Sequence, residues 1–223
     1  MMPMRSTQHV TAMPLQNRVT PTGEIVAVPA RGTLMGNRGI IHDPDTKQLL
    51  TRRWQHQAWV CCELSFKNHR HPIMGRSAYT ELFFLDEPTA LAGGHRPCAY
   101  CRRNDFNAFK AAWLAGQHRD PVHFISARIL DRKLHEERVT RTRAQVRFHA
   151  PWAGLPDGSL VMVDGHAHLI NGSQLFPWHA EGYASPELRP RSGDVCVLTP
   201  RSIVAALVEG FEPRCHPSIE RWM

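Results

Sequence analysis

Two cysteines, Cys98 and Cys101, are separated by two residues and directly follow Pro97. Behind them, Phe106, Phe109 and Trp113 recur at intervals of three and four residues, which predicts a helix with one aromatic side in the core. Two thiols at the mouth of a helix can point at one centre, and half of a tetrahedral zinc site is usually built with this spacing. The pair therefore predicts a turn between two elements and two metal ligands.

The residues before this pair predict a short strand and a helix. Phe83, Phe84 and Leu85 form an apolar strand, and Asp86 is a good N-cap for a helix that has Pro88 in its first turn. Gly93-Gly94 can supply the left-handed residue that ends this helix. The cysteine pair is thus expected to lie at a break in the chain between two helices.

The class of the protein follows from its length and composition. The chain has 223 residues and 42% hydrophobic content, enough for a real core. No run approaches the roughly eighteen apolar residues of a membrane span, and the first residues lack the apolar core of a secretory signal. We expect a cytoplasmic protein with no membrane partner, in which the six cysteines serve metal or thiol chemistry rather than disulfides.

A third ligand is expected from the alternating segment 58–66. Val60, Cys62 and Leu64 share one face of a strand, and Cys61 and Glu63 share the other. We interpret this strand and 79–85 as a hairpin, with Cys62 on its buried face. Cys61 could join Cys62 at one metal only across a bulge. The fourth ligand is left open among Cys61, His42, His71 and His95.

Residues 61–105 resemble the latter half of the zinc-binding N-terminal domain of the Ada family of methylphosphotriester-repair and response proteins. The matching residues are Phe83-Phe84, Ala90-Leu91-Ala92, Gly94, Arg96-Pro97-Cys98 and Cys101. The resemblance implies a zinc ion held by four cysteines, one of which accepts a methyl group from a DNA phosphotriester. The chain departs from the family pattern because Cys61 and Cys62 are adjacent, whereas the family separates its first two cysteines, and because position 66 is Phe.

The basic residues suggest a nucleic-acid partner. The net charge is +7, and 23 of the 27 basic residues are arginines, which match phosphate geometry. Arg102 and Arg103 directly follow the cysteine pair at the start of the next helix. Arg141 and Arg143 fall in a run that alternation predicts to be a strand with arginines on one face. These four are our candidate phosphate contacts. A merely solvated surface is the competing interpretation.

Two other chemistries fit parts of the sequence. Cys61-x-Glu63 with Pro97-Cys98-x-x-Cys101 has the letters of a zinc deaminase, in which a glutamate moves protons beside a zinc-bound water. His166 and His168 resemble the metal-binding opening of amidohydrolase-type barrels, but too few residues follow them for such a barrel. A thioredoxin-like use of Cys98 and Cys101 ranks lower, because no βαβ unit surrounds them.

We predict an α+β fold with four parts. These are a disordered leader (1–20), an Ada-like zinc-binding domain with a knuckle, hairpin and helix (21–118), a basic helical connector (119–150) and a β-rich region with a C-terminal helix (151–223). Hairpin turns are expected at Asp164-Gly165 and 171–173, and a helix from Arg201 stopped by Gly210. The leading function is zinc-stabilised DNA binding in the response to DNA damage. The alternatives are a zinc-dependent hydrolase or deaminase, and an interaction module without catalysis.

Overall fold

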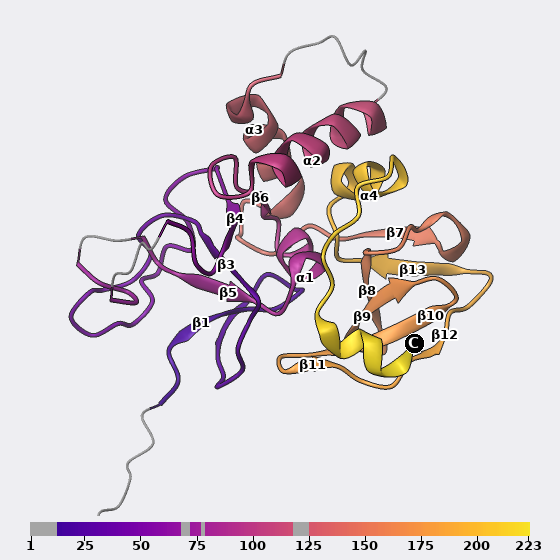
Figure 1. The fold of residues 1–223 in the computed structure, drawn as a ribbon, viewed down its shortest axis with the longest axis horizontal. Coiled ribbons are helices and arrows are strands. Elements are labelled where there is room, and N and C mark those ends of the chain that lie inside the picture. The colour runs from indigo at the N-terminus through magenta and orange to yellow at the C-terminus, as the bar shows by residue number, and fades with distance from the viewer. Residues whose placement is uncertain (1–12, 68–71, 77–78, 118–124) are drawn as a thin grey trace, which may run out of the picture.

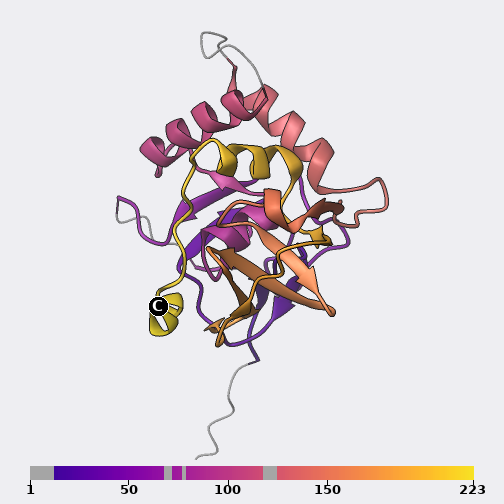
Figure 2. The same cartoon turned by 90° about the vertical axis from the view of Figure 1, so that its right-hand side faces the viewer.

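The computed structural model combines two β-sheets with a layer of helices, which confirms the predicted α+β class. It describes residues 13–67, 72–76, 79–117 and 125–223. Figure 1 shows the N-terminal sheet on the left, the C-terminal sheet on the lower right and helices α2 and α3 above them. Seen from the side in Figure 2, α2, α3 and α4 lie together over one end of the molecule.

The first sheet has the strand order β2-β1-β5-β3-β4-β6. Its strands are β1 (Gln16–Val19), β2 (Ile25–Ala27), β3 (Leu34–Asn37), β4 (Val60–Glu63), β5 (Leu82–Phe84) and β6 (Arg96–Pro97). The predicted leader (1–20) is wrong at its end, because Gln16–Val19 form β1, which pairs with both β2 and β5. Residues 1–12 of that prediction lie outside the described residues. The predicted hairpin between β4 and β5 is wrong, because β3 lies between them and pairs antiparallel with each. Gly36 in β3 permits this close packing, since a Cβ there would lie 2.4 Å from the carbonyl oxygen of Val60.

Helix α1 (Glu87–Ala92) follows β5 and has the predicted caps. The Asp86 carboxylate accepts hydrogen bonds from the backbone N–H and the hydroxyl of Thr89, at 3.0 and 2.7 Å. Gly94 has φ +80°, the left-handed conformation expected at a helix C-terminus. This turn returns the chain to β6 and so delivers the cysteine pair to the edge of the sheet.

The second sheet has the order β11-β10-β9-β8-β13-β7, with β12 also pairing with β10. Both predicted hairpins are present, because β8 (Leu160–Val163), β9 (His166–Asn171) and β10 (Gln174–His179) pair antiparallel in succession. Asp164 and Gly165 have φ +47° and +80°, as a tight hairpin turn requires. The remaining strands are β7 (Phe148–Pro151), β11 (Gly182–Tyr183), β12 (Glu187–Leu188) and β13 (Asp194–Val197).

One helical core spans segments that the sequence analysis assigned to different parts. Helices α2 (Arg103–Gly116), α3 (Ala127–Arg138) and α4 (Arg201–Val208) share a cluster that contains Phe109, Leu130 and Ile203, all fully buried. Ser126 caps α3, because its hydroxyl accepts from the Ile129 N–H at 3.4 Å. Ile129 is 41% exposed, and Leu130 instead faces the core. Short 3₁₀ turns cover Trp152–Gly154 and Pro217–Trp222.

The arginine-rich run after α3 is a turn and not the predicted strand. An isolated bridge joins Val139 to Gln145, and Arg143 in the turn has φ +68°. The Thr140 N–H donates to the Ala144 carbonyl at 2.8 Å, which closes the turn. Regular alternation therefore fails here, and Arg141 and Arg143 do not form one face of a strand.

In the part of the chain that is described, no helix is both long enough and apolar enough to cross a membrane.

Candidate metal centre

Three cysteines converge at the edge of the first sheet. Cys62, Cys98 and Cys101 each place a sulfur within 4.8 Å of the other two, and no disulfide joins them. Sulfur atoms bound to one tetrahedral zinc at about 2.3 Å lie roughly 3.8 Å apart, so this spacing suits a shared ion. These three residues, the cysteine cluster, could hold a metal ion.

Strand pairing brings the cysteine cluster together. β4 and β6 run parallel with Cys61 opposite Pro97, and the Cys98 N–H donates to the Cys61 carbonyl at 2.9 Å. Cys62 is therefore next to the turn that holds Cys98 and Cys101. Within that turn the Tyr100 N–H donates to the Cys98 sulfur at 3.4 Å, which orients the sulfur and stabilises its anionic form.

The electrostatics of the cluster favour negative charge on at least one sulfur. Hydrogen bonds from the thiols of Cys101 and Cys62 hold the pKa of the Cys98 thiol far below its usual range. The same contacts with Cys101 and Cys98, together with burial, raise the pKa of the Cys62 thiol. A thiolate that accepts from two thiols is the arrangement expected of sulfurs crowded around the place of a cation.

Cys61 does not belong to the cysteine cluster. Strand alternation turns its side chain to the opposite face of the sheet, where it packs with Leu82, Phe84 and Ala90 in the core. It is 1% exposed, and burial raises the pKa of its thiol. The bulge that would have allowed both adjacent cysteines to bind one metal is absent, since β3 and β4 pair in unbroken register from Leu34–Glu63 to Asn37–Val60.

The candidate histidine ligands are engaged elsewhere or lie outside the described residues. The two ring nitrogens of His42 contact Thr80 Oγ1 at 2.6 Å and the Gly75 carbonyl at 3.3 Å. His95 is fully buried, and its Nε2 accepts from Arg38 at 3.2 Å. His71 is not among the described residues. Within the described ranges, no fourth cysteine, histidine or carboxylate joins the three sulfurs.

A cavity of about 780 Å³ opens beside the cysteine cluster. All three cysteines line it, and its other lining residues are mostly apolar, among them Met35, Val60, Phe66, Ile73 and Phe83. Tyr79 and Glu81 add a hydroxyl and a carboxylate to the wall. Burial, aided by the nearby cysteines and Glu81, raises the pKa of Tyr79 to about 12, so its hydroxyl stays protonated at neutral pH.

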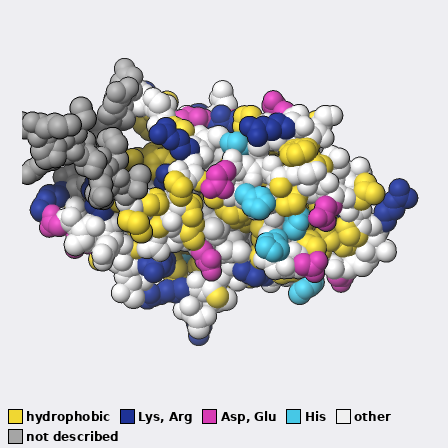
Figure 3. Space-filling view, turned by 90° about the horizontal axis from the view of Figure 1, so that it is seen from below, with side chains coloured by type: hydrophobic (Ala, Val, Ile, Leu, Met, Phe, Trp, Pro, Cys, Tyr) yellow, Lys and Arg dark blue, Asp and Glu magenta, His cyan; other side chains and the backbone are white. Residues whose placement is uncertain are grey.

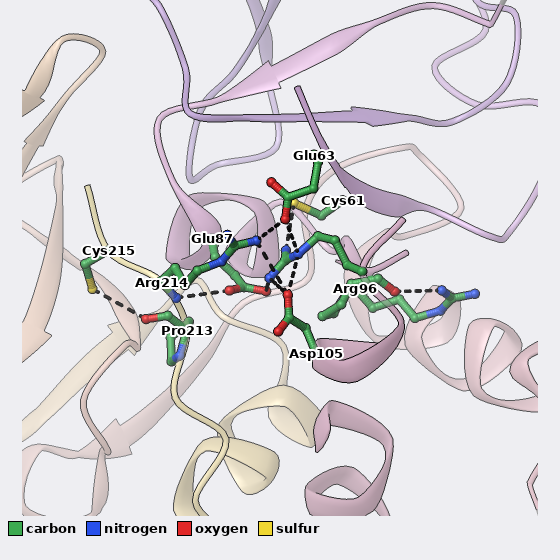
Figure 4. Close-up of polar contacts among 10 residues, drawn as sticks. Cys61, Glu63, Glu87, Arg96, Asp105, Pro213, Arg214 and Cys215 are labelled. Atoms are coloured by element: carbon green, nitrogen blue, oxygen red, sulfur yellow. Dashed lines mark hydrogen bonds and ion pairs between the residues drawn. The ribbon is translucent and has the colours of Figure 1, made fainter. Parts of the chain in front are cut away.

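Arg102 is a structural residue and not the phosphate contact that we predicted. Its side chain is fully buried, with Nη2 2.7 Å from both Glu87 Oε1 and Asp105 Oδ2. Arg214, from the C-terminal segment, joins the same network through Glu63 at 2.5 Å and through its backbone N–H to Glu87 at 3.0 Å. Figure 4 shows the labelled groups of this network close together: Glu63 of β4, Glu87 of α1, Asp105 of α2 and Arg214 of the C-terminal segment.

The other predicted phosphate contacts do not gather in one place. Arg103 is exposed at the start of α2, whereas Arg141 and Arg143 are exposed in the turn after α3, where Arg143 donates to the Thr51 carbonyl at 2.9 Å. Figure 3 shows basic, acidic and histidine side chains interspersed over the face that it presents. For the described residues, a continuous basic surface is therefore not seen on that face.

His166 and His168, the other candidate metal ligands, lie in β9. His168 Nδ1 contacts the His166 carbonyl at 3.0 Å, and no metal-ligand cluster forms around them within the described ranges. The hairpin pattern accounts for both residues.

The sequence did not indicate Tyr79 and Glu81 as site residues, because residues that line a cavity from separate segments leave no spacing signal.

The resemblance to the Ada family rests on the matching residues between Phe83 and Cys101 alone and stays a prediction. What is established for this chain is a three-cysteine cluster in an α+β fold. No protein-family model matches the chain, and no curated protein or solved structure matches it either.

Proposed function

We propose that this protein is a zinc protein that binds DNA in the response to DNA damage, with zinc held by Cys62, Cys98 and Cys101. The observation that carries the proposal is the convergence of three sulfurs within 4.8 Å from two separate segments of the chain. Thiolate ligands favour zinc among the common metals, and a closed or nearly closed sulfur site is typical of structural zinc. Iron–sulfur clusters also use thiolates, so metal identity is part of the test.

The proposed role in DNA damage rests on the resemblance to Ada. Three thiolates leave a bound Zn²⁺ with one net negative charge, and a thiolate in such a site is a good nucleophile toward an alkyl group. We nominate Cys62 as the acceptor. Its thiolate would attack the methyl carbon of a phosphotriester while the carbon–oxygen bond breaks, which yields a thioether and a phosphodiester anion. The apolar cavity suits the uncharged triester better than an ordinary, negatively charged phosphodiester.

A second candidate, a zinc-dependent hydrolase, is favoured by the cavity beside the cysteine cluster. Catalytic zinc keeps three protein ligands and an open position for water or substrate. Glu81 lines the cavity, and its Oε2 accepts from the Met74 N–H at 2.7 Å. The specific deaminase pattern is weakened, because its first ligand, Cys61, faces the opposite side of the sheet.

Metal analysis and DNA binding test the proposal together. We expect about one zinc per chain in the wild type, loss of zinc in Cys98→Ser, and retention in the matched control Cys196→Ser, since Cys196 lies in β13 outside the cluster. X-ray absorption would distinguish four sulfurs from three sulfurs and one nitrogen or oxygen. Absence of zinc from freshly prepared protein would remove the proposal.

The DNA arm uses duplex DNA with and without a methylphosphotriester, over a range of salt. DNA is supported as the partner if the slope of the logarithm of the binding constant against the logarithm of the salt concentration corresponds to several phosphate contacts. Transfer of the methyl group to Cys62 would be seen as a mass increase of the peptide that contains Cys62. A protein that contains zinc but binds no DNA at low salt would exclude the DNA-binding role and favour an interaction module without catalysis. Hydrolytic turnover that is lost in Glu81→Gln would favour the hydrolase.

A further inference from the structure

A second cavity, of about 440 Å³, has a wall rich in arginine and shares no residue with the cavity beside the cysteine cluster. It lies where β1, β2, the end of α3 and the turn 139–147 meet. Five arginines line it, against one acidic residue, Glu24, which is exposed: Arg38, Arg53, Arg138, Arg143 and Arg147. We call this the arginine cavity.

Two of these arginines are buried. Arg38 and Arg138 are 3% and 2% exposed, and their guanidinium groups lie 4.0 and 4.5 Å from the ring of Trp59. Arg38 donates to His95 at 3.2 Å, and Arg138 donates to the carbonyls of Gly94 and Gln57 at 2.6 and 2.8 Å. Stacking on an aromatic ring and bonding to carbonyls hold both side chains in place without neutralising their charge.

No carboxylate makes an ion pair with either group in the described part of the chain. Burial, with Arg138 and Arg53 as neighbours, lowers the pKa of Arg38 to about 9. Burial also lowers the pKa of Arg138 to about 9, although the nearby Asp131 carboxylate, which is paired with Arg96, opposes this shift. Arg138 Nε also has no hydrogen-bond partner. Buried charges in proteins are normally paired, because an unpaired one loses its hydration without compensation.

Two other buried arginines of this chain, Arg96 and Arg102, do have carboxylate partners. Arg96 makes two 2.8 Å contacts with Asp131, and Arg102 faces Glu87 at 2.7 Å. The carboxylate partners missing at Arg38 and Arg138 therefore mark an uncommon site. A negative group in the cavity would supply the direct ion pairs that the described residues do not provide to Arg38 and Arg138.

The outer arginines are suitably placed to complete such a site. Arg53 donates to the Leu50 carbonyl, Arg143 donates to the Thr51 carbonyl, and Arg147 donates to Gln145. Among the described residues, none of the three makes an ion pair with a carboxylate. Trp54, partly exposed in the same wall, packs against Trp59 with ring centroids 5.7 Å apart. It offers an aromatic face next to the positive wall.

We propose that the arginine cavity binds a phosphate-bearing ligand, with the phosphate compensating Arg38, Arg53 and Arg138 and with Trp54 beside the group that carries the phosphate. Guanidinium groups form paired hydrogen bonds with phosphate oxygens. A multiply charged anion compensates the charge of several arginines better than a single carboxylate does. The volume falls within the range of small-ligand sites. The phosphate can come from a free nucleotide or from a nucleic-acid strand.

The test compares two double variants that remove the same charge. Arg53→Gln/Arg147→Gln alters the cavity at residues that are not fully buried, so the fold is retained, whereas Arg128→Gln/Arg132→Gln alters exposed positions on α3 outside it. Calorimetry measures the binding of pyrophosphate, adenosine monophosphate and a short single-stranded oligonucleotide to each protein. Circular dichroism and thermal unfolding check that each variant is folded.

We expect wild-type protein to bind at least one of these probes and the cavity variant to bind it at least tenfold more weakly, with less than a twofold change in the control. Pyrophosphate or nucleotide binding identifies a small ligand, and binding of the oligonucleotide alone identifies a strand. Equal loss in both variants would reduce the effect to general charge and overturn the proposal, as would no binding of any probe. The outcome is independent of zinc, because the cavity contains no cysteine.

Discussion

The guanidinium of Arg102 lies 2.7 Å from the carboxylate of Glu87, and both side chains are almost completely inaccessible to solvent. This pair links the residue after Cys101 to the first turn of α1. It therefore ties the turn that holds two cysteines to the helix that precedes it.

Replacing Arg102 with Met should destabilise the fold by about 3–5 kcal/mol, because the buried Glu87 carboxylate loses its ion-pair partner and keeps only the hydrogen bond from the Arg214 N–H. Urea unfolding followed by circular dichroism measures this loss. The matched control is Arg214→Met, whose side chain is 54% exposed in the same network and should cost less than about 1 kcal/mol. Equal losses in the two variants would show that burial does not decide the strength of these pairs.

The adjacent cysteines should behave differently when each is changed to Ala. Cys62→Ala is expected to lose the metal, because its sulfur belongs to the cysteine cluster. Cys61→Ala should keep the metal and lose roughly 1–2 kcal/mol of stability through the small gap left in the core. Zinc analysis and urea unfolding separate the two effects. Loss of metal from Cys61→Ala alone would mean that β4 is bulged in solution.

Stability should fall as the pH drops below about 6.5, with His95 as one cause. Burial, with Arg38 and Arg138 nearby, holds the pKa of His95 well below 6.5 in the folded protein. The unfolded chain binds a proton near pH 6.5 and the folded one does not, so the contribution of His95 is fully present above that pH. Below it, stability should decline by up to about 1.4 kcal/mol per pH unit.

His95→Phe fills similar space without titrating, and it should therefore show a shallower fall in unfolding free energy between pH 6.5 and 5.5. Urea titrations at several pH values give both slopes. The variant will be less stable at every pH, since Arg38 loses its partner at 3.2 Å. An unchanged slope would assign the pH dependence to other groups.

Gly94→Ala should be strongly destabilising. Gly94 has φ +80°, and a Cβ there would lie 2.6 and 2.8 Å from Cδ and Cβ of Arg138. The change combines backbone strain of about 1 kcal/mol with displacement of a buried arginine. In Gly172→Ala, φ is +59° and the Cβ meets nothing within 4 Å, so only the backbone strain remains. Thermal unfolding of both variants should rank Gly94→Ala as clearly the less stable.

Elements with local signals could be predicted from the sequence. The Asp86 cap, the left-handed Gly94, the aromatic stripe of α2 and the Asp164-Gly165 turn depend on neighbouring residues, and each is present. The same holds for Cys98 and Cys101, whose spacing alone places their sulfurs together. The two-residue period of a strand also separated Cys62 from Cys61, but the hairpin that was expected to position Cys62 is absent.

What the sequence could not settle depends on pairing across long separations. The order of β3, β4 and β5 is decided by which strands bury their faces together, and this placed β3 where a hairpin was expected. Arg102 was predicted to be a surface residue beside a cysteine, yet Glu87 of α1 and Glu63 of β4 reach it from distant parts of the chain. The arginine cavity likewise gathers residues from 38 to 147.

The sequence by itself therefore determined the local elements and two of the three clustered sulfurs, because caps, turns and periodicity act over a few residues. Only the tertiary structure decided which face each adjacent cysteine takes relative to the turn, which arginines are buried and which charges lack a partner. Those outcomes depend on burial and on distances between segments, and neither quantity exists until the sheets and helices have packed.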